Sequence, residues 1–417
     1  MKAHGRSLLA PIASLLALCI SAPIHAELPT LPTASPESVG FDSKVLASLD
    51  SQMHALVDQQ KLAGVVTLIA RHGKVVHFDT YGKADASSGA PLKSDSIFRI
   101  ASMTKPIAGV AMMQLYERGK WRLDDPVAKY IPEFANLQVK TADGRTEPQK
   151  SPMTMAQLMS HSAGFGVSSV YAQADLGATD LQGMIDKLKA LPLETQPGTA
   201  WDYGPSVNIQ GYVIEKLSGQ SLDVYLDEHI FKPLGMVDTG FWVSPGKAAR
   251  VVSIHTYDAA GKIIVQNPQR VVTTRPSFLA ASGGLMSTAS DYWRFSQALL
   301  NGGELDGKRI LKPETVKLMR TNVLQPGADV DLFGPTLEGI GFGMDFAIVT
   351  DTAAAKTPMG LNSFYWGGAF GTWFWIDPTN DLVFVGMIQN LSGSTPTGGT
   401  PGVREISVAA TYDALKK

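Results

Sequence analysis

One short segment of the chain contains the residue types needed for nucleophilic catalysis. Ser102 and Lys105 are three residues apart, and the apolar positions that follow them recur at helical spacing. Residues three apart share one face of a helix, so the hydroxyl and the amine are expected to be neighbours. A serine hydroxyl is a weak nucleophile until a base takes its proton, and an uncharged lysine amine can be that base. The segment predicts a serine hydrolase, although a helix cap followed by a surface lysine has the same spacing.

The elements that must position this segment are predicted near both ends of the chain. Strand-like segments lie there in pairs, each pair joined by a turn, and helical segments accompany them. We therefore expect an α/β fold of the α+β type, with one antiparallel sheet built from both chain ends and flanked by helices. The predicted strands are residues 65–70, 75–78, 372–376 and 382–388. One predicted helix is capped by Asp42 or Ser43, and a second, closing helix covers residues 406–415.

The middle of the chain has a different character. Residues 121–270 are rich in Pro, Gly and short helical stretches, which predicts an inserted, mainly helical lobe. Residues 41–120 and 271–417 would then form the sheet lobe, and residues 27–417 a single catalytic domain. A cleft between two such lobes is a common place for a binding site.

The first 26 residues have the layout of a secretory signal peptide. A basic start is followed by an apolar run over residues 8–20, and Ala26 closes the segment with a small residue. We expect cleavage near Ala26 and a periplasmic or secreted protein. An uncleaved anchor and lipidation at Cys19 are the alternatives, but the run is short for a membrane span. Cys19 is the only cysteine, so the mature chain would have neither disulfides nor a catalytic thiol.

Composition narrows the range of partners. The formal net charge is −2, without the basic excess that nucleic acid or acidic membrane surfaces attract. His229 beside Asp227 and Glu228 lacks the spacing of a zinc motif. We expect a small-molecule ester or amide as the partner, no stable membrane insertion and no metal or organic cofactor, and the oligomeric state stays open.

The residues around Ser102 resemble a known family. Residues 98–105 are similar to the nucleophile segment of the serine β-lactamase and penicillin-binding-protein superfamily, and are closest to the class C β-lactamase-like branch that includes the family VIII carboxylesterases. The resemblance implies a β-lactamase/transpeptidase-like fold and an acyl-enzyme on Ser102. It continues in the family's order at residues 158–164, 197–203, 282–288 and 366–368.

The second family motif begins at Tyr203. In this family a tyrosine acts as general base together with the lysine, so the resemblance assigns that role to Tyr203 beside Lys105. A phenol needs a cationic neighbour to serve as a base near neutrality. Pro205 stands where the lactamases have an asparagine, and it lacks the amide that would bind a β-lactam side chain.

The third motif is Trp366–Gly367–Gly368, which resembles the family VIII carboxylesterases. Lactamases usually have a lysine here, whereas Trp366 offers no charge to the carboxylate of a β-lactam. Trp366 is expected to form an apolar wall for an uncharged substrate, and Gly367 and Gly368 to let the substrate approach the strand closely. The resemblance implies that the backbone N–H groups of Ser102 and Ala369 bind the oxyanion.

These observations together predict an exported serine hydrolase that cleaves esters of short or medium acyl chain. An amide-directed hydrolase is the first alternative, whether a peptidase, a linear-oligomer amidase or a weak β-lactamase. The second is a non-catalytic penicillin-binding module. Intact Ser102, Lys105 and Tyr203 argue against the second alternative.

Overall fold

The computed structural model describes Met1 and residues 30–266, 272–331, 336–391 and 402–416. Apart from Met1, the predicted signal peptide over residues 1–26 lies outside the described residues. The chain divides into the units Met1–Thr30 and Leu31–Lys417, and the architecture below is that of the second unit. A search of the described residues finds no helix with both the length and the apolar character needed to cross a membrane.

The central element is a seven-stranded antiparallel sheet formed by both ends of the unit. Its strand order is β11-β12-β13-β14-β15-β1-β2, so an N-terminal strand pairs with the last C-terminal strand. This confirms the expected α/β fold with one antiparallel sheet from both ends. The strands are β1 (Gly64–Arg71), β2 (Lys74–Gly82), β11 (Ile340–Phe342), β12 (Ala347–Val349), β13 (Phe364–Gly367), β14 (Trp373–Asp377) and β15 (Leu382–Met387).

Strand β1 is apolar on both faces because both faces of the sheet are covered. Successive side chains of a strand point to opposite faces. Val65 and Ile69 join one hydrophobic cluster, while Val66 and Leu68 join another on the opposite face. An antiparallel sheet covered on both sides accounts for a continuous run of buried residues in place of alternation.

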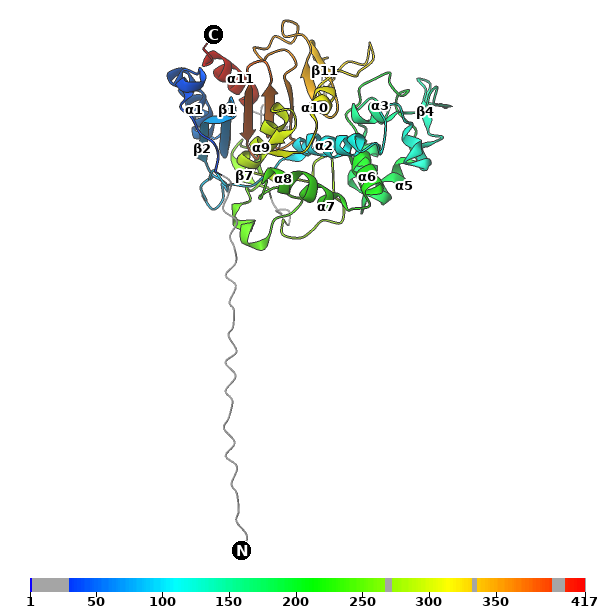
Figure 1. Ribbon diagram of the computed structural model, residues 1–417, viewed down its shortest axis with the longest axis horizontal. Helices are drawn as coiled ribbons and strands as arrows, with labels where there is room; N and C mark the ends of the chain where they lie inside the picture. The colour runs from blue at the N-terminus through cyan, green and yellow to red at the C-terminus, as the bar shows by residue number, and fades with distance from the viewer. Residues whose placement is uncertain (2–29, 267–271, 332–335, 392–401, 417) are drawn as a thin grey trace. The chain divides into compact units, whose positions relative to one another are not determined.

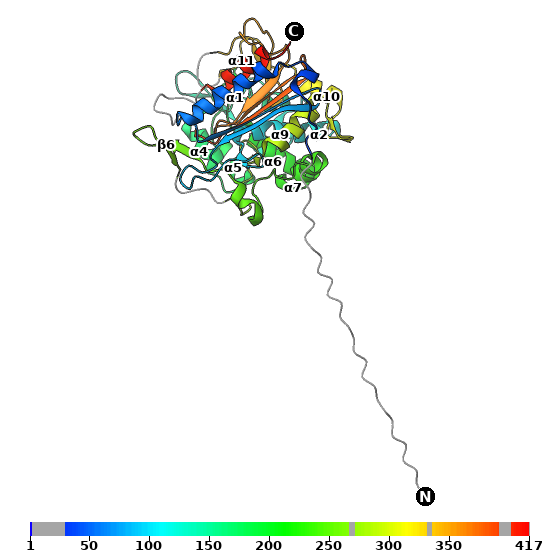
Figure 2. The same ribbon diagram turned by 90° about the vertical axis from the view of Figure 1, so that its left-hand side faces the viewer.

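Helices α1 (Ser43–Asp58) and α11 (Val403–Asp413) cover one face of the sheet, and Figure 2 shows them crossing it side by side. The Asp42 carboxylate caps α1 by accepting hydrogen bonds from the backbone N–H groups of Lys44 and Val45, as the sequence predicted. Helices α2 (Thr104–Glu117) and α9 (Ala289–Leu300) belong to the cluster on the other face.

The middle of the chain is mostly helical. In Figure 1 three helices, α3 (Met155–Met159), α5 (Leu181–Leu188) and α6 (Ser206–Ser218), and strand β4 (Gln138–Lys140) lie on the side of α2 away from α1 and α11. Helix α6 contacts α2, α3, α5 and α7, so it is the packing centre of this region. The helices are α3 (Met155–Met159), α4 (Ser169–Leu176), α5 (Leu181–Leu188), α6 (Ser206–Ser218), α7 (Leu222–Leu226) and α8 (Lys232–Leu234), and α10 (Pro313–Met319) follows later. Short antiparallel pairs complete the unit: β4 (Gln138–Lys140) with β5 (Thr146–Pro148), β6 (His255–Tyr257) with β7 (Ile263–Val265), and β9 (Glu304–Leu305) with β10 (Lys308–Arg309).

A separate small ladder leads into the predicted nucleophile. Strand β3 (Phe98–Arg99) pairs with β8 (Met286–Ser287), and Gly240 forms a bridge to Met286 on the far side of β8. Ile97, just before β3, bridges to Val251. The chain therefore reaches Ser102 from a strand that is held on both sides.

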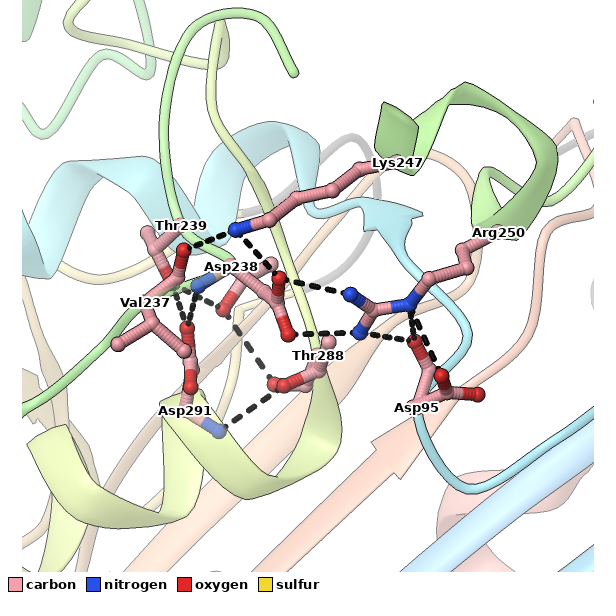
Figure 3. Close-up of polar contacts among 9 residues, drawn as sticks. Asp95, Val237, Asp238, Thr239, Lys247, Arg250, Thr288 and Asp291 are labelled. Carbon is pink, nitrogen blue, oxygen red and sulfur yellow. Dashed lines mark hydrogen bonds and ion pairs between the residues drawn. The ribbon is translucent and has the colours of Figure 1, made fainter. Parts of the chain in front are cut away.

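Figure 3 shows an ionic network beside this ladder, in which Asp238 and Asp291 are buried. The Asp238 carboxylate accepts two hydrogen bonds from the Arg250 guanidinium, at 2.9 and 2.6 Å, and lies 2.8 Å from the Lys247 amine. Arg250 also pairs with Asp95 at 3.0 Å, close to the start of β3. The Asp291 carboxylate accepts a 2.7 Å bond from the backbone N–H of Asp238, and burial raises the pKa of Asp291 to about 7. The network thus joins the ladder to the start of α9.

We expect Asp238→Asn to lower the free energy of unfolding by about 3 kcal/mol, since it removes the buried carboxylate charge and leaves the partly buried guanidinium with Asp95 as its remaining ion pair. Lys247→Met is the matched control: the Lys247 side chain is 35% exposed, and its loss should cost about 1 kcal/mol or less. Urea unfolding of both variants measures the difference. Equal midpoints for Asp238→Asn and the unaltered protein would show that the network contributes nothing to stability.

Candidate active site

Ser102 lies in a tight turn between β3 and α2. This turn, Ala101–Met103, is a 3-10 helix, and Ala101 has a φ of 43°. A non-glycine residue rarely adopts a positive φ unless its surroundings hold it there. The backbone of Ile100, just before the turn, is held on both sides: its N–H donates to the Leu285 carbonyl at 3.0 Å, and its carbonyl accepts from the Thr372 hydroxyl at 3.1 Å. The backbone that carries Ser102 is therefore tightly fixed.

Lys105 lies in the first turn of α2, as its spacing from Ser102 predicted, and its side chain is buried. The amine donates hydrogen bonds to the Ser102 hydroxyl at 3.1 Å and to the Ser282 carbonyl at 2.7 Å. Two acceptors in different directions leave the amine little freedom to move. It is therefore placed to exchange a proton with Ser102.

Tyr203 lies in the loop before α6, and its ring contacts the Lys105 amine. The Lys105 nitrogen lies 4.5 Å from the centre of the Tyr203 ring, and the Trp366 indole N–H donates to the Tyr203 hydroxyl at 3.1 Å. Ser102, Lys105 and Tyr203 all line one cavity of about 360 Å³. The structure thus brings together the hydroxyl, the amine and the phenol that the sequence singled out.

Trp366, Gly367 and Gly368 lie at the end of β13, beside this cavity but not among the residues described as lining it. Trp366 is buried, and its indole N–H donates a hydrogen bond to the Tyr203 hydroxyl. A Cβ atom at Gly368 would collide with the Ile100 carbonyl oxygen and the Thr372 hydroxyl. That glycine lets β13 approach the nucleophile segment. Direct contact of these three residues with substrate stays a prediction.

Ala369, the residue predicted to supply the second oxyanion N–H, does line the cavity. It follows Gly368, whose N–H donates to the Thr372 carbonyl at 2.7 Å and so holds this turn closed. Gly283 lines the cavity as well, and a Cβ atom added there would lie 3.5 Å from the Ala101 backbone. The predicted oxyanion donors Ser102 and Ala369 therefore belong to the same cavity.

Sequence reasoning missed a chain of polar groups that ends at Lys105. The Ser282 carbonyl accepts from the Lys105 amine, and the Ser282 N–H donates to Asn208 Oδ1 at 2.7 Å. Asn208 Nδ2 in turn donates to Asp175 Oδ1 at 2.6 Å. Asn208 is fully buried inside α6, and buried polar side chains require such partners. The one available signal was a polar residue between Val207 and Ile209 in a helical segment.

His161 packs against Tyr203 and does not share the cavity wall described above. Its ring centre is 5.0 Å from that of Tyr203, and Trp201 and Phe342 contact it from other sides. Burial, with a smaller contribution from the charge of Lys105, lowers the pKa of His161 to about 3. The imidazole is therefore neutral at pH 7 and supports the tyrosine ring by packing.

No group of three His, Cys, Asp or Glu side chains within the described ranges is arranged to hold a metal ion. The side chains that line the cavity include a hydroxyl, an amine and a phenol, from Ser102, Lys105 and Tyr203, which are groups that acyl transfer can use. The binding of an oxyanion by the N–H groups of Ser102 and Ala369 stays a prediction.

Comparison with known proteins gives a consistent result. The family model described as Beta-lactamase matches residues 49–405. Esterase EstB of Burkholderia gladioli is 30% identical over 375 residues, which cover 83% of this chain and 91% of the esterase. A putative D-alanyl-D-alanine carboxypeptidase of Escherichia coli K12 is 28% identical over 407 residues, covering 90% of this chain and 89% of that protein.

A solved structure shares the fold. EstCE1, described as a hydrolase with promiscuous acyltransferase activity, superposes with a TM-score of 0.73 at 23% sequence identity. The match covers 90% of this chain and 99% of EstCE1. Both sheet and helical regions are therefore common to the two proteins.

Proposed function

The chain belongs to the beta-lactamase family and is a serine hydrolase, and we propose that it cleaves carboxylic esters of short or medium acyl chain through an acyl-enzyme on Ser102. The observation that carries the ester preference is the hydrogen bond from the Trp366 indole to the Tyr203 hydroxyl. A tryptophan at this position gives the site no ammonium group for the carboxylate of a β-lactam. The similarity to an esterase over most of the chain supports the same substrate class.

Acylation begins when the Ser102 oxygen attacks the ester carbonyl carbon and its proton passes to the Lys105–Tyr203 pair. The 3.1 Å contact between the Lys105 amine and the Ser102 oxygen supports this transfer. The carbonyl oxygen gains negative charge, which the N–H groups of Ser102 and Ala369 stabilise. The tetrahedral intermediate then collapses, Tyr203 returns the proton to the departing alkoxide, and the alcohol leaves.

Deacylation repeats these steps with water as the nucleophile. Tyr203 takes a proton from water, the resulting hydroxide attacks the acyl carbonyl, and the proton returns to the Ser102 oxygen as the acid leaves. The contact between Lys105 and the Tyr203 ring supports a shared role, because a nearby cation stabilises a phenolate. No step in this sequence uses a cofactor.

Amide hydrolysis is the second candidate function, and the similarity to a putative D-alanyl-D-alanine carboxypeptidase favours it. Purified protein should be assayed on p-nitrophenyl butyrate, a chromogenic cephalosporin and a D-alanyl-D-alanine peptide. We expect kcat/KM to be more than about tenfold higher for the ester, since a charge-assisted hydrogen bond to the cephalosporin carboxylate, worth roughly 1.5–3 kcal/mol, is missing. Faster turnover of the cephalosporin or the peptide would replace the ester proposal with the amide one.

We also propose that the chain is exported, on the basis of the charged start, the apolar run and Ala26 in residues 1–26. Export of the full-length chain in a bacterial host should yield a mature protein that begins close to Glu27. N-terminal sequencing of the exported protein tests this, and an intact N-terminus in the membrane fraction would instead indicate an anchor.

A further inference from the structure

Asp175, on α4, is a buried carboxyl group in the wall of the catalytic cavity. Its side chain is 8% exposed, and it lines the same cavity as Ser102, Lys105 and Tyr203. Its Oδ1 atom accepts a 2.6 Å hydrogen bond from Asn208. Its Oδ2 atom has no hydrogen bond to any residue that the structure describes. One carboxylate oxygen is thus held in place while the other remains available.

Burying this carboxyl group costs free energy. Acidic side chains are almost never buried unless they are paired with a cation or fully hydrogen-bonded. Within the described ranges Asp175 forms no ion pair, and burial raises its pKa to about 6, with the hydrogen bond from Asn208 and the charge of Lys105 only partly opposing that effect. The group is therefore mostly ionised at pH 7.5 and lacks a neutralising partner in the free enzyme.

Two other polar side chains of the cavity form hydrogen bonds to protein groups. The Lys105 amine binds Ser102 and Ser282, and the Tyr171 hydroxyl donates to the Pro192 carbonyl. Much of the remaining wall is apolar, including Val167, Ala172 and Pro205. Asp175 is the one carboxylate among the described residues that line the cavity. A ligand there meets a single anionic acceptor in a mostly apolar wall.

We propose that Asp175 binds an ammonium group of the substrate, so that the enzyme prefers esters carrying a protonated amine over uncharged esters of the same shape. This inference rests on the proposed ester hydrolysis for its catalytic consequence, but the binding of the cation does not depend on turnover. An ammonium group supplies both the charge and the N–H donors that the free carboxylate oxygen lacks.

A competing explanation is that Asp175 only positions Lys105, through Asn208 and Ser282. The variant Asp175→Asn separates the two roles, because its amide oxygen can still accept from Asn208 while the negative charge is lost. A positioning role predicts little change in selectivity. A binding role predicts a larger fall in kcat/KM for the cationic substrate than for the uncharged one.

The experiment compares two pairs of esters with matched shapes at pH 7.5. Ethyl 6-aminohexanoate against ethyl heptanoate tests the acyl side, and 6-aminohexyl acetate against heptyl acetate tests the alcohol side. For at least one pair we expect kcat/KM to favour the amine by about tenfold or more, the range of a charged hydrogen bond. Asp175→Asn should bring that ratio close to one, because the loss of the negative charge lowers kcat/KM more for the amine ester than for its uncharged partner. Asp186→Asn on α5, which removes a charge from an exposed pair with Lys189, should retain the preference.

Calorimetric titration of the Ser102→Ala protein with the same four esters keeps the inference separate from ester hydrolysis. Tighter binding of an amine ester, lost when Asp175→Asn is added, supports the cation site even if no ester is hydrolysed. Equal affinities and equal kcat/KM values within both pairs would overturn the inference. So would an equal loss for charged and uncharged esters in Asp175→Asn.

Discussion

Ser102→Ala should reduce kcat/KM for p-nitrophenyl butyrate by about 10⁴-fold or more, because the proposed acyl-enzyme cannot form without the serine oxygen. The fold should survive, since the hydroxyl is a small group that faces a cavity and the backbone around it is held by Leu285 and Thr372. Steady-state kinetics measure the loss, and thermal unfolding followed by circular dichroism verifies the fold.

Two further readouts make this result specific. A fluorophosphonate should label the unaltered protein once and leave Ser102→Ala unlabelled, because the reagent reacts with an activated serine. Ser51→Ala, which removes an exposed serine from α1, is the control and should change neither labelling nor activity. Labelling that persists in Ser102→Ala would mean that another serine is the nucleophile.

Tyr203→Phe has the second largest expected effect, a fall in kcat of about 10²–10⁴-fold, the range of general acid–base catalysis. The phenylalanine ring preserves packing against His161 and Trp201, so the change removes little except the hydroxyl. Because that hydroxyl is proposed to handle the proton in both half-reactions, burst kinetics with p-nitrophenyl butyrate should show that acylation and deacylation are both slower.

Trp366→Phe is the matched control for the tyrosine variant. It removes the indole N–H that donates to Tyr203 but keeps the phenol itself. A single neutral hydrogen bond is worth about 1 kcal/mol, so activity should fall by less than about tenfold. If Tyr203→Phe also falls by less than tenfold, Lys105 alone would be the base and the phenol would have only a positioning role.

Together the two variants assign separate functions to neighbouring side chains. Ser102 and Lys105 come from one turn and one helix, whereas Tyr203 and Trp366 reach them from a loop and from strand β13. The tyrosine hydroxyl accepts the indole N–H of Trp366, and the Lys105 amine lies 4.5 Å from the centre of the tyrosine ring. Its orientation therefore depends on the docking of the helical region against the sheet.

The sequence by itself determined the features that depend on interactions between residues close together in the chain. The three-residue spacing of Ser102 and Lys105 predicted that their side chains are neighbours, and they form a 3.1 Å hydrogen bond although Ser102 lies in the 3-10 turn just before α2. The strands β1, β2, β14 and β15 were predicted from β-prone runs and turns, because burial on both faces of a sheet leaves continuous apolar segments in the sequence.

Only the tertiary structure decided which distant groups meet at the site. The bond between Trp366 and Tyr203 joins residues 163 positions apart, and the bond between Lys105 and the Ser282 carbonyl spans 177 positions. No periodicity or local motif encodes such pairs. The sequence suggested that Trp366 forms an apolar wall for the substrate, on the basis of its side-chain chemistry alone. In the folded protein its indole N–H donates a hydrogen bond to the Tyr203 hydroxyl.

The buried carboxylate of Asp175 is the clearest example of a feature that could not be predicted from the sequence. In the sequence it is one acidic residue among many, on a helix with no motif. Its significance comes from burial, from the bond to Asn208 and from a place in the cavity wall, and all three depend on how α4, α6 and the nucleophile turn pack together. Electrostatic effects are set by surroundings in three dimensions, so the sequence specifies the charge but only the fold determines what it can bind.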